Sequence, residues 1–565
     1  MMKYRQLLVI SIIATFGVCM SSATPLRTEA NKVVEWSYTS AKQYQNPFHE
    51  LELTAHLSLP DGNQLKLPGF WAGGSTWKFR YASNLEGEHH FVTSCSDQDN
   101  RDLQNQSGTI VVTKYHGSNP LYKHGPLKIS PDQRHFEHQD GTPFFWLADS
   151  WWHGMTKRFE WPDDFKALTA DRKQKGFSVI QFAIGFPCDI APFDERGQNE
   201  AGDPWDSGLN SINPAYFDLA DQRIQHLLDQ GLVPNVVGLW GYYMKFFGVE
   251  TIKNHWDYLI ARYGAYPVTW TLCGESTLAY YTDLADNWDF YKDQFRSQWS
   301  EVARHVQRND PFDRLLTVHP GPGIHDGKPP VYDMDALDFI MLQSGHEGFR
   351  TIPKAKEFVS QYMKDYPNQP VMHGEVCFEG MHGGGSGQKV QRILFWSDIL
   401  SGTSGFCYGV EGIWQFNTRD KPFGVSPGGN NWGNVPWNVA AQYPGSTQLG
   451  IGKSILEQFE WWKLEPNQDW VEESNSDDAF KTYIAGMGED FRIAYLYKFV
   501  TRYRSVRITG LSPQSDYQAT YFDPITGDRY DMGIIEADHD GKITAPPNPI
   551  MQDWVLVLQK SINQR

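Results

Sequence analysis

Residues 144–183, FFWLADSWWHGMTKRFEWPDDFKALTADRKQKGFSVIQFA, hold the pattern that decides the fold. An apolar run, 144–149, leads into a polar loop, and Pro162 then opens a helix, because proline tolerates the first helical position. The helix closes near Gly176, and a second apolar run covers 179–183. Strand, loop, helix and strand in this order predict a βαβ unit with parallel strands.

The same alternation continues toward the C-terminus. A helical face carries Phe217, Ala220, Ile224, Leu227 and Leu228. Six more apolar runs follow, at 233–237, 268–272, 315–319, 337–342, 370–373 and 403–408. Eight such runs predict a (β/α)8 barrel over residues 135–465, with long loops. An open doubly wound sheet is the alternative fold, although its Gly-rich dinucleotide fingerprint is not in the sequence.

Alternating β patterns flank this segment on both sides. Residues 30–120 hold short alternating runs separated by Gly, Asn and Asp, and residues 468–562 return to the same pattern. Short strands with regular turn signals predict antiparallel β-sandwiches. We therefore expect a multidomain chain of the α/β plus all-β class, in which a TIM barrel carries an N-terminal and a C-terminal sandwich.

The first 23 residues have the features of a secretory signal peptide. A basic start precedes the apolar run 7–20, and Ser21-Ser-Ala23 supplies small residues for cleavage. We expect export, so that the mature protein is secreted or periplasmic. A lipoprotein anchored through Cys19 is the less favoured alternative, since Val18 fits that signal poorly. No later segment predicts a membrane span.

Composition narrows the range of ligands. The net charge of −17 argues against nucleic acid, which needs clustered Lys and Arg. The chain has 21 Trp residues, whose flat faces suit sugar rings, although barrel cores also use aromatic residues. Its six scattered cysteines suggest neither a disulfide framework nor zinc spacing, and we expect no metal and no cofactor. The oligomeric state is left open.

Two glutamates stand where a barrel has its active site. Glu275 follows the fourth apolar run and Glu375 the seventh, so both fall at carboxyl ends of strands, on opposite sides of the barrel mouth. Each is preceded by glycine, which permits close approach of a neighbouring group. Glycoside cleavage needs two such opposed carboxyl groups. Glu379 and Glu411 are competitors, for which we expect substrate contact or structural pairing.

Other polar and aromatic residues near strand ends are candidates for sugar contacts. Asp149 would bind substrate hydroxyls or, equally, serve as a helix cap or an Arg partner. The remaining candidates could instead pack or pair within the barrel, and they are Trp152, Gln181, Trp240, His319, Gln343, His373, Tyr408 and Trp414. The loops 380–387 and 416–437 are long and rich in glycine, and we expect them to overhang the pocket.

Three segments resemble a known family. Phe145-Trp-Leu-Ala-Asp-Ser-Trp-Trp152, Gly274-Glu275 and Pro370-Val-Met-His-Gly-Glu375 are similar to motifs of apiosidase-like barrels. The predicted barrel also looks like that of a retaining glycosidase clan. Members of this clan have an acid/base Glu after strand four and a nucleophile Glu after strand seven. The resemblance implies that Glu275 is the general acid/base and Glu375 the nucleophile. Tyr521-Phe-Asp-Pro-Ile-Thr-Gly527 resembles a signature of the collagen-binding-type sandwich that often follows such barrels.

These observations predict a retaining glycoside hydrolase acting on a plant or algal poly- or oligosaccharide. Two alternatives remain open. The paired sandwiches would also suit a non-catalytic carbohydrate- or matrix-binding protein. Tyr408 and His373 would suit the base of a polysaccharide lyase or a dehydratase.

Overall fold

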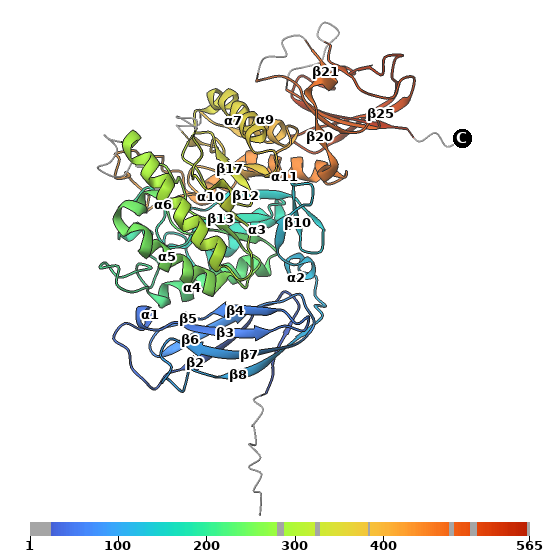
Figure 1. Ribbon diagram of the computed structural model, residues 1–565. Coiled ribbons are helices and arrows are strands. Elements are labelled where there is room, and N and C mark those ends of the chain that lie inside the picture. Colours follow the sequence, from blue (N-terminus) through green and yellow to red (C-terminus); the bar gives the residue numbers. More distant parts are fainter. Residues whose placement is uncertain are drawn as a thin grey trace, which may run out of the picture.

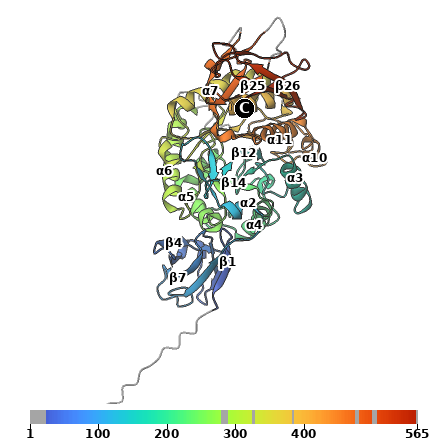
Figure 2. The ribbon, with the colours of Figure 1, turned by 90° about the vertical axis from the view of Figure 1, so that its right-hand side faces the viewer.

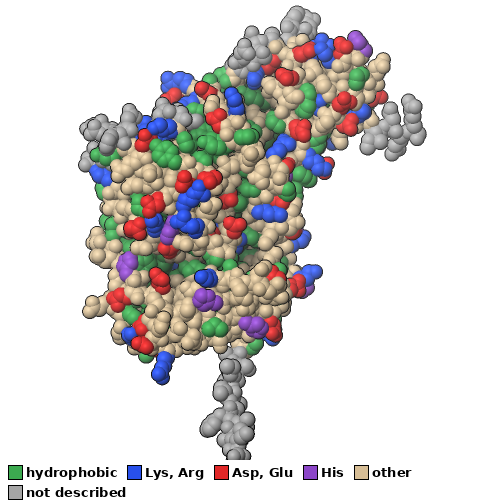
Figure 3. All heavy atoms as spheres, viewed as in Figure 1, with side chains coloured by type: hydrophobic (Ala, Val, Ile, Leu, Met, Phe, Trp, Pro, Cys, Tyr) green, Lys and Arg blue, Asp and Glu red, His purple; other side chains and the backbone are tan. Residues whose placement is uncertain are grey.

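The computed structural model describes residues 24–278, 288–322, 328–381, 385–473, 479–497 and 505–561. The predicted signal peptide lies outside these ranges. The chain forms three stacked parts, with the barrel between two β-sandwiches (Figures 1 and 2). On the face shown in Figure 3, acidic and basic side chains are interspersed.

The N-terminal part packs a five-stranded sheet against a three-stranded one. The larger sheet has the order β1(Leu26–Glu29), β8(Ser107–Thr113), β7(Gly87–Cys95), β3(Leu53–Ser58), β4(Gln64–Pro68), and the smaller one β2(Val34–Thr39), β6(Thr76–Tyr81), β5(Phe70–Trp71). One pair departs from the predicted antiparallel pattern, since β1 runs parallel to β8. The chain passes from β1 directly into β2 of the other sheet, so no hairpin fixes the direction of β1 relative to its neighbour.

The central part confirms the predicted barrel. Its eight strands are all parallel, in the order β16(Leu316–Thr317), β15(Thr269–Thr271), β14(Val233–Val237), β13(Val179–Ala183), β12(Trp146–Ser150), β19(Gly405–Tyr408), β18(Val371–Glu375), β17(Ile340–Gln343). The ring closes between the first and last of these. Asp338 N donates to Leu316 O at 2.8 Å, and Thr317 Oγ1 donates to Phe339 O at 2.7 Å.

Helices cover the outside of the barrel, as Figure 1 shows. They are α3(Asp163–Gln174), α4(Pro214–Asp229), α5(Met244–Tyr263), α6(Trp288–Asn309), α7(Thr351–Asp365), α9(Gln388–Ile399), α10(Trp437–Ala440) and α11(Pro444–Leu456). The face of α4 predicted from Phe217 to Leu228 is buried. Between β16 and β17 the described residues form only a short 3-10 turn, Met334–Ala336, where the repeat would place an α-helix.

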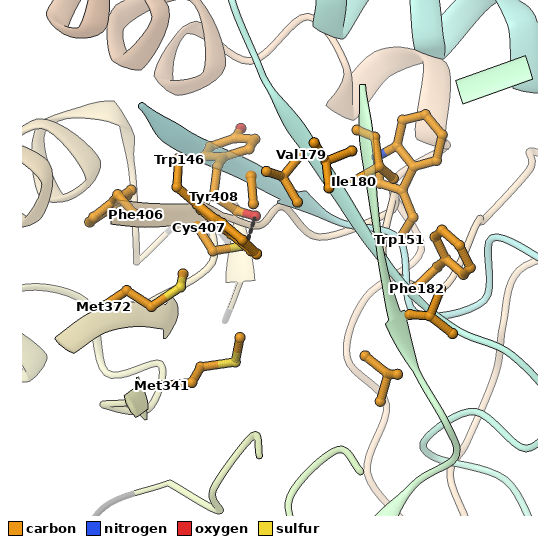
Figure 4. Close-up of a cluster of buried hydrophobic side chains, with 14 of the residues drawn as sticks. Trp146, Trp151, Val179, Ile180, Phe182, Met341, Met372, Phe406, Cys407 and Tyr408 are labelled. Carbon is orange, nitrogen blue, oxygen red and sulfur yellow. Dashed lines mark hydrogen bonds between the residues drawn. The ribbon is translucent and has the colours of Figure 1, made fainter. Parts of the chain in front are cut away.

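The core of the barrel is built from side chains of neighbouring strands. Figure 4 shows Trp146, Met341, Met372 and Phe406 among them, and all four are 2% exposed or less. Such dense packing holds the strands in place and thereby fixes where their carboxyl ends lie.

The C-terminal part is a second sandwich. A six-stranded sheet has the order β20(Glu465–Pro466), β22(Tyr483–Met487), β23(Phe491–Leu496), β28(Trp554–Lys560), β25(Asp516–Phe522), β26(Arg529–Glu536), and it faces β21(Val471–Glu472), β24(Arg507–Ile508), β27(Ile543–Thr544). Every pair recorded between these strands is antiparallel. Within the described ranges, each helix of the chain is too short or too polar to cross a bilayer.

Buried arginine–carboxylate pairs join the sandwiches to the barrel. Arg80 of β6 and Arg262 of α5 share Asp221 of α4. On the other side, Arg392 of α9 binds Asp553 through two hydrogen bonds of 2.9 and 2.8 Å. Asp553 precedes β28, so this pair ties the C-terminal sandwich to a barrel helix.

Candidate active site

A pocket with about 540 Å³ of empty space lies among the loops that follow the barrel strands. This volume includes space that is open to solvent. Its lining is rich in aromatic side chains and contains three carboxylates. The lining residues are Trp152, Cys188, Asp189, Trp240, Glu275, Leu278, Pro322, Gln343, His346, Glu375, Phe378, Met381, Trp414 and Trp432.

One amide group joins the two predicted catalytic glutamates. Gln343 Nε2, at the end of β17, donates to Glu275 Oε1 at 3.0 Å and to Glu375 Oε1 at 2.7 Å. Because both bonds end on one nitrogen, the two Oε1 atoms lie no further apart than the combined length of these bonds. The barrel therefore brings both carboxyl groups to one place in the pocket.

Glu275 is held in a strained and enclosed position. Its φ angle is 48°, in the left-handed region that side chains such as Glu rarely adopt. Trp240 Nε1 donates to Glu275 Oε2 at 3.0 Å. The preceding Gly274 makes this contact possible, since a Cβ there would lie 2.3 Å from a carbon of the Trp240 ring. Strain of this kind persists where the surrounding structure enforces it, and it gathers at functional sites.

Glu375 ends β18 and is surrounded by N–H donors. His346 Nε2 lies 3.0 Å from Glu375 Oε1, and His319 Nε2 lies 3.4 Å from Oε2. The Nδ1 atom of each ring accepts a backbone N–H, from Phe378 at 3.1 Å and from Glu275 at 3.3 Å. An imidazole nitrogen that accepts a hydrogen bond carries no proton, so both neutral rings present Nε2–H to Glu375.

These surroundings push the two pKa values apart. Burial, together with the negative charge of Glu375, raises the pKa of Glu275 above its usual range, although Trp240 and Gln343 act in the opposite direction. Burial also acts to raise the pKa of Glu375, but the nearby rings of His319 and His346 outweigh it and hold that pKa below its usual range. The pair is therefore set to carry one proton, on Glu275.

The predicted site residues divide into two groups. Trp152, Trp240, Gln343 and Trp414 line the pocket with the two glutamates. His319 lies beside the pocket, where it contacts Glu375 and the edge of the Trp152 ring.

Four other candidates lie in the barrel wall, in contact with protein groups and outside the pocket lining. Arg172 Nε and Trp151 Nε1 donate to Asp149 at 2.6 and 2.8 Å, so the alternative reading of Asp149 as an Arg partner matches its position. The other three bind protein groups as well: Gln181 binds Ser150 Oγ and Gly374 O, His373 binds Asp398, and Tyr408 donates to Glu379.

The competing glutamates also lie outside the pocket lining. Glu379 accepts hydrogen bonds from Tyr408 Oη at 2.7 Å and from Gly445 N. Glu411 accepts a long bond of 3.4 Å from Val435 N. Both therefore have the structural pairing that was one of their two expected roles.

The pocket also contains residues that sequence reasoning missed. His346 stands three residues beyond the end of β17, and its position after a strand was the one available signal. Trp432 belongs to the long loop expected over the pocket, and its Nε1 donates to Asp189 Oδ1 at 3.2 Å. This bond links the loop after β19 to the loop after β13. Of the loop 380–387, residues 382–384 lie outside the described residues, and Met381 lines the pocket.

A metal ion would need several ligating side chains in one place. Among the residues that the structure describes, no three His, Cys, Asp or Glu side chains are grouped so as to hold one.

Comparison with known proteins gives three family matches along the chain. Residues 130–463 match "Apiosidase-like, catalytic domain". Residues 27–96 match a domain of unknown function, DUF5060, and residues 466–559 match "Putative collagen-binding domain of a collagenase". No curated protein matches the chain.

Solved structures show the same architecture. A "putative glycoside hydrolase" from Bacteroides vulgatus ATCC 8482 is similar with a TM-score of 0.70 at 18% identity, covering 95% of this chain and 100% of that one. A glycoside hydrolase family 5 protein from the same organism has a TM-score of 0.64 at 21% identity, covering 79% of this chain and 96% of its own. At such low identity these likenesses establish the fold. The catalytic-domain match, however, covers more than half of the sequence, and the chain therefore belongs to the apiosidase-like family and is a glycosidase.

Proposed function

We propose that this enzyme cleaves a glycosidic bond of a poly- or oligosaccharide with retention of anomeric configuration. The observation that carries the proposal is the shared contact of Glu275 and Glu375 with Gln343 Nε2. It limits the distance between the two oxygens to less than the ~6.5–9.5 Å separation typical of inverting enzymes. Retaining enzymes have carboxyl groups ~5–5.5 Å apart, which fits this limit.

The pKa order supports the two proposed roles. Glu275, with a raised pKa, holds the proton that passes to the leaving glycosidic oxygen. Glu375, with a lowered pKa, is ionised and attacks the anomeric carbon to form a covalent glycosyl–enzyme ester. In the second step Glu275 takes a proton from water, the water oxygen bonds to the anomeric carbon, and the Glu375 carboxylate is released.

The alternative of a lyase or dehydratase has less support. It rested on Tyr408 and His373 as the base, and these side chains are buried against Glu379 and Asp398. A non-catalytic binding protein would not require two opposed carboxyl groups with divergent pKa values. The signal-peptide pattern of residues 1–23 supports export, and we propose a plant or algal polysaccharide outside the cell as the substrate.

Trapping the intermediate tests the proposal directly. A 5-fluoro glycosyl fluoride, which keeps the hydroxyl at C2, should label the enzyme, and peptide mass analysis should find the sugar on Glu375. NMR of the first product should show the anomer of the substrate. An inverted first product, or a label on a different residue, would contradict the mechanism.

Substitutions test the same roles. Glu375→Gln should abolish turnover, and Glu275→Gln should lower kcat/KM by about 10²–10⁴ on substrates with poor leaving groups. The matched control is Glu357→Gln on the exposed face of α7, which should keep wild-type activity. Full activity of the Glu275 or Glu375 variant would remove that residue from the mechanism.

A further inference from the structure

Among the residues that the structure describes, two buried polar atoms of the pocket lining have no protein partner. They are Gln343 Oε1, an acceptor, and Trp414 Nε1, a donor. Both side chains are only 3% exposed. Buried polar groups of native proteins are almost always paired, so an acceptor and a donor left unpaired along a pocket mark places for polar groups of a ligand. A hydroxyl group can both donate and accept, and sugars carry several.

The orientation of the Gln343 amide follows from its neighbours. An ionised carboxylate only accepts hydrogen bonds, so the amide atom 2.7 Å from Glu375 Oε1 must be the nitrogen. The two hydrogens on this nitrogen are used by the two glutamates. The carbonyl oxygen, Oε1, is therefore the atom left to meet a substrate.

The position of the amide selects one hydroxyl of the sugar. The bond that is cleaved requires the anomeric carbon to lie between Glu275 and Glu375. Gln343 touches both carboxylates and therefore lies beside that carbon. One ring neighbour of the anomeric carbon is the ring oxygen, and the other, C2, carries a hydroxyl in most sugars. The C2 hydroxyl is thus the one nearest to the Gln343 amide.

We infer that Gln343 determines specificity by accepting a hydrogen bond from the C2 hydroxyl of the sugar that is cleaved. The substrate is then a glycoside with a free hydroxyl at C2, and 2-deoxy sugars are rejected. This inference rests on the proposed function and deepens it. Sites built to bind a hydroxyl discriminate strongly against analogues that lack it, because their own polar groups are then left unpaired. Since the same amide holds Glu375, the contact joins recognition of the sugar to placement of the nucleophile.

The test changes the enzyme and the substrate together. The substrates are the best-cleaved 4-nitrophenyl glycoside of a panel and its 2-deoxy counterpart, with spontaneous hydrolysis subtracted. Wild-type enzyme should prefer the hydroxylated substrate by on the order of 10⁴-fold in kcat/KM. Gln343→Met, which keeps the length of the side chain without its polar atoms, should reduce this preference to a few-fold. Most of the decrease in kcat/KM of Gln343→Met should occur with the hydroxylated substrate.

The matched control is Gln361→Met on the exposed face of α7, which should leave both rates and their ratio unchanged. Melting temperatures of all variants report whether folding is intact. A Gln343→Met enzyme that keeps the preference, or that loses the same factor on both substrates, would overturn the inference while leaving the proposed function standing. Failure of the wild-type enzyme to cleave any glycoside would contradict the proposed function itself.

Discussion

Glu275 and Glu375 carry the same functional group and differ in what surrounds each one. Burial acts on both in the same direction, so burial alone would leave them alike. The difference arises from the donors, because two histidine rings face the carboxylate of Glu375, whereas the indole N–H of Trp240 donates to Glu275. The different roles proposed for the two glutamates therefore follow from the residues that surround each of them.

The pH dependence of activity should reflect this difference. In the proposed mechanism Glu375 must be ionised and Glu275 protonated, so kcat/KM should fall at low pH as Glu375 gains a proton and at high pH as Glu275 loses its proton. The bond from Trp240 stabilises the ionised form of Glu275 and lowers its pKa. In Trp240→Phe this bond is absent, and the alkaline limb of the profile should move to higher pH.

The control for this shift is Trp152→Phe. Its ring packs against Trp240 with centroids 5.0 Å apart and, in contrast to Trp240, makes no hydrogen bond with Glu275 or Glu375 among the described contacts. The alkaline limb of the pH profile of Trp152→Phe should stay at the wild-type pH even if kcat/KM itself changes. A limb that moves to lower pH in Trp240→Phe would show that the indole N–H does not set the pKa of Glu275.

Sequence reasoning located the two glutamates but could not separate substrate contacts from structural pairs. Asp149 and Glu275 both follow apolar strands, and nothing local distinguishes them. The difference is made by Arg172, which lies 23 residues from Asp149 in the chain and reaches it only when α3 packs on the barrel. Pairings of this kind depend on the folded arrangement of elements, so the local pattern of the sequence does not show them.

At the scale of elements, the strands were predictable and the loops were not. The apolar runs at 179–183 and 233–237 coincide with β13 and β14, because buried parallel strands need continuous apolar side chains. The left-handed backbone of Asp189, with φ of 59°, and its bond with Trp432 depend on contacts between two loops. Loop length indicated that 416–437 would reach the pocket, but not which of its residues would line it.

Two arginines hold the loop 416–437 over the pocket. Arg158 donates to the carbonyl oxygens of Phe416 and Lys421, and Arg196 donates to those of Phe423 and Val425. Arg158→Ala should loosen the loop, raise KM and lower kcat/KM by about 10-fold, since small displacements of positioning groups cost rate.

Hydrogen exchange of residues 416–437 checks this expectation, and faster exchange should accompany the loss of activity. Arg419→Ala is the control, because Arg419 is exposed in the same loop. Unchanged exchange and KM in Arg158→Ala would show that other contacts suffice to hold the loop.

For the whole molecule, the buried arginine–carboxylate pairs determine whether the three parts behave as one. Arg392 and Asp553 are 4% and 3% exposed, so water cannot hydrate the charged group that remains when its partner is removed. Asp553→Ala should therefore destabilise the protein by about 3–5 kcal/mol. Calorimetry should show the C-terminal sandwich melting apart from the barrel.

The double variant Arg392→Met/Asp553→Ala is the informative comparison, because it also removes the charge left unpaired. It should recover much of the lost stability. A double variant as unstable as Asp553→Ala would mean that packing, rather than the unpaired charge, accounts for the loss.

The left-handed backbone conformation of Glu275 places the thermal stability of the enzyme in opposition to its catalytic activity. A residue such as Glu at φ of 48° stores about 1–3 kcal/mol of strain, which Asn or Gly relieves. Glu275→Asn and Glu275→Gly should therefore melt at a higher temperature than the wild-type enzyme while losing catalysis. Directed evolution that selects on heat resistance alone would accumulate inactive enzymes at this position, so selection for activity must accompany every round.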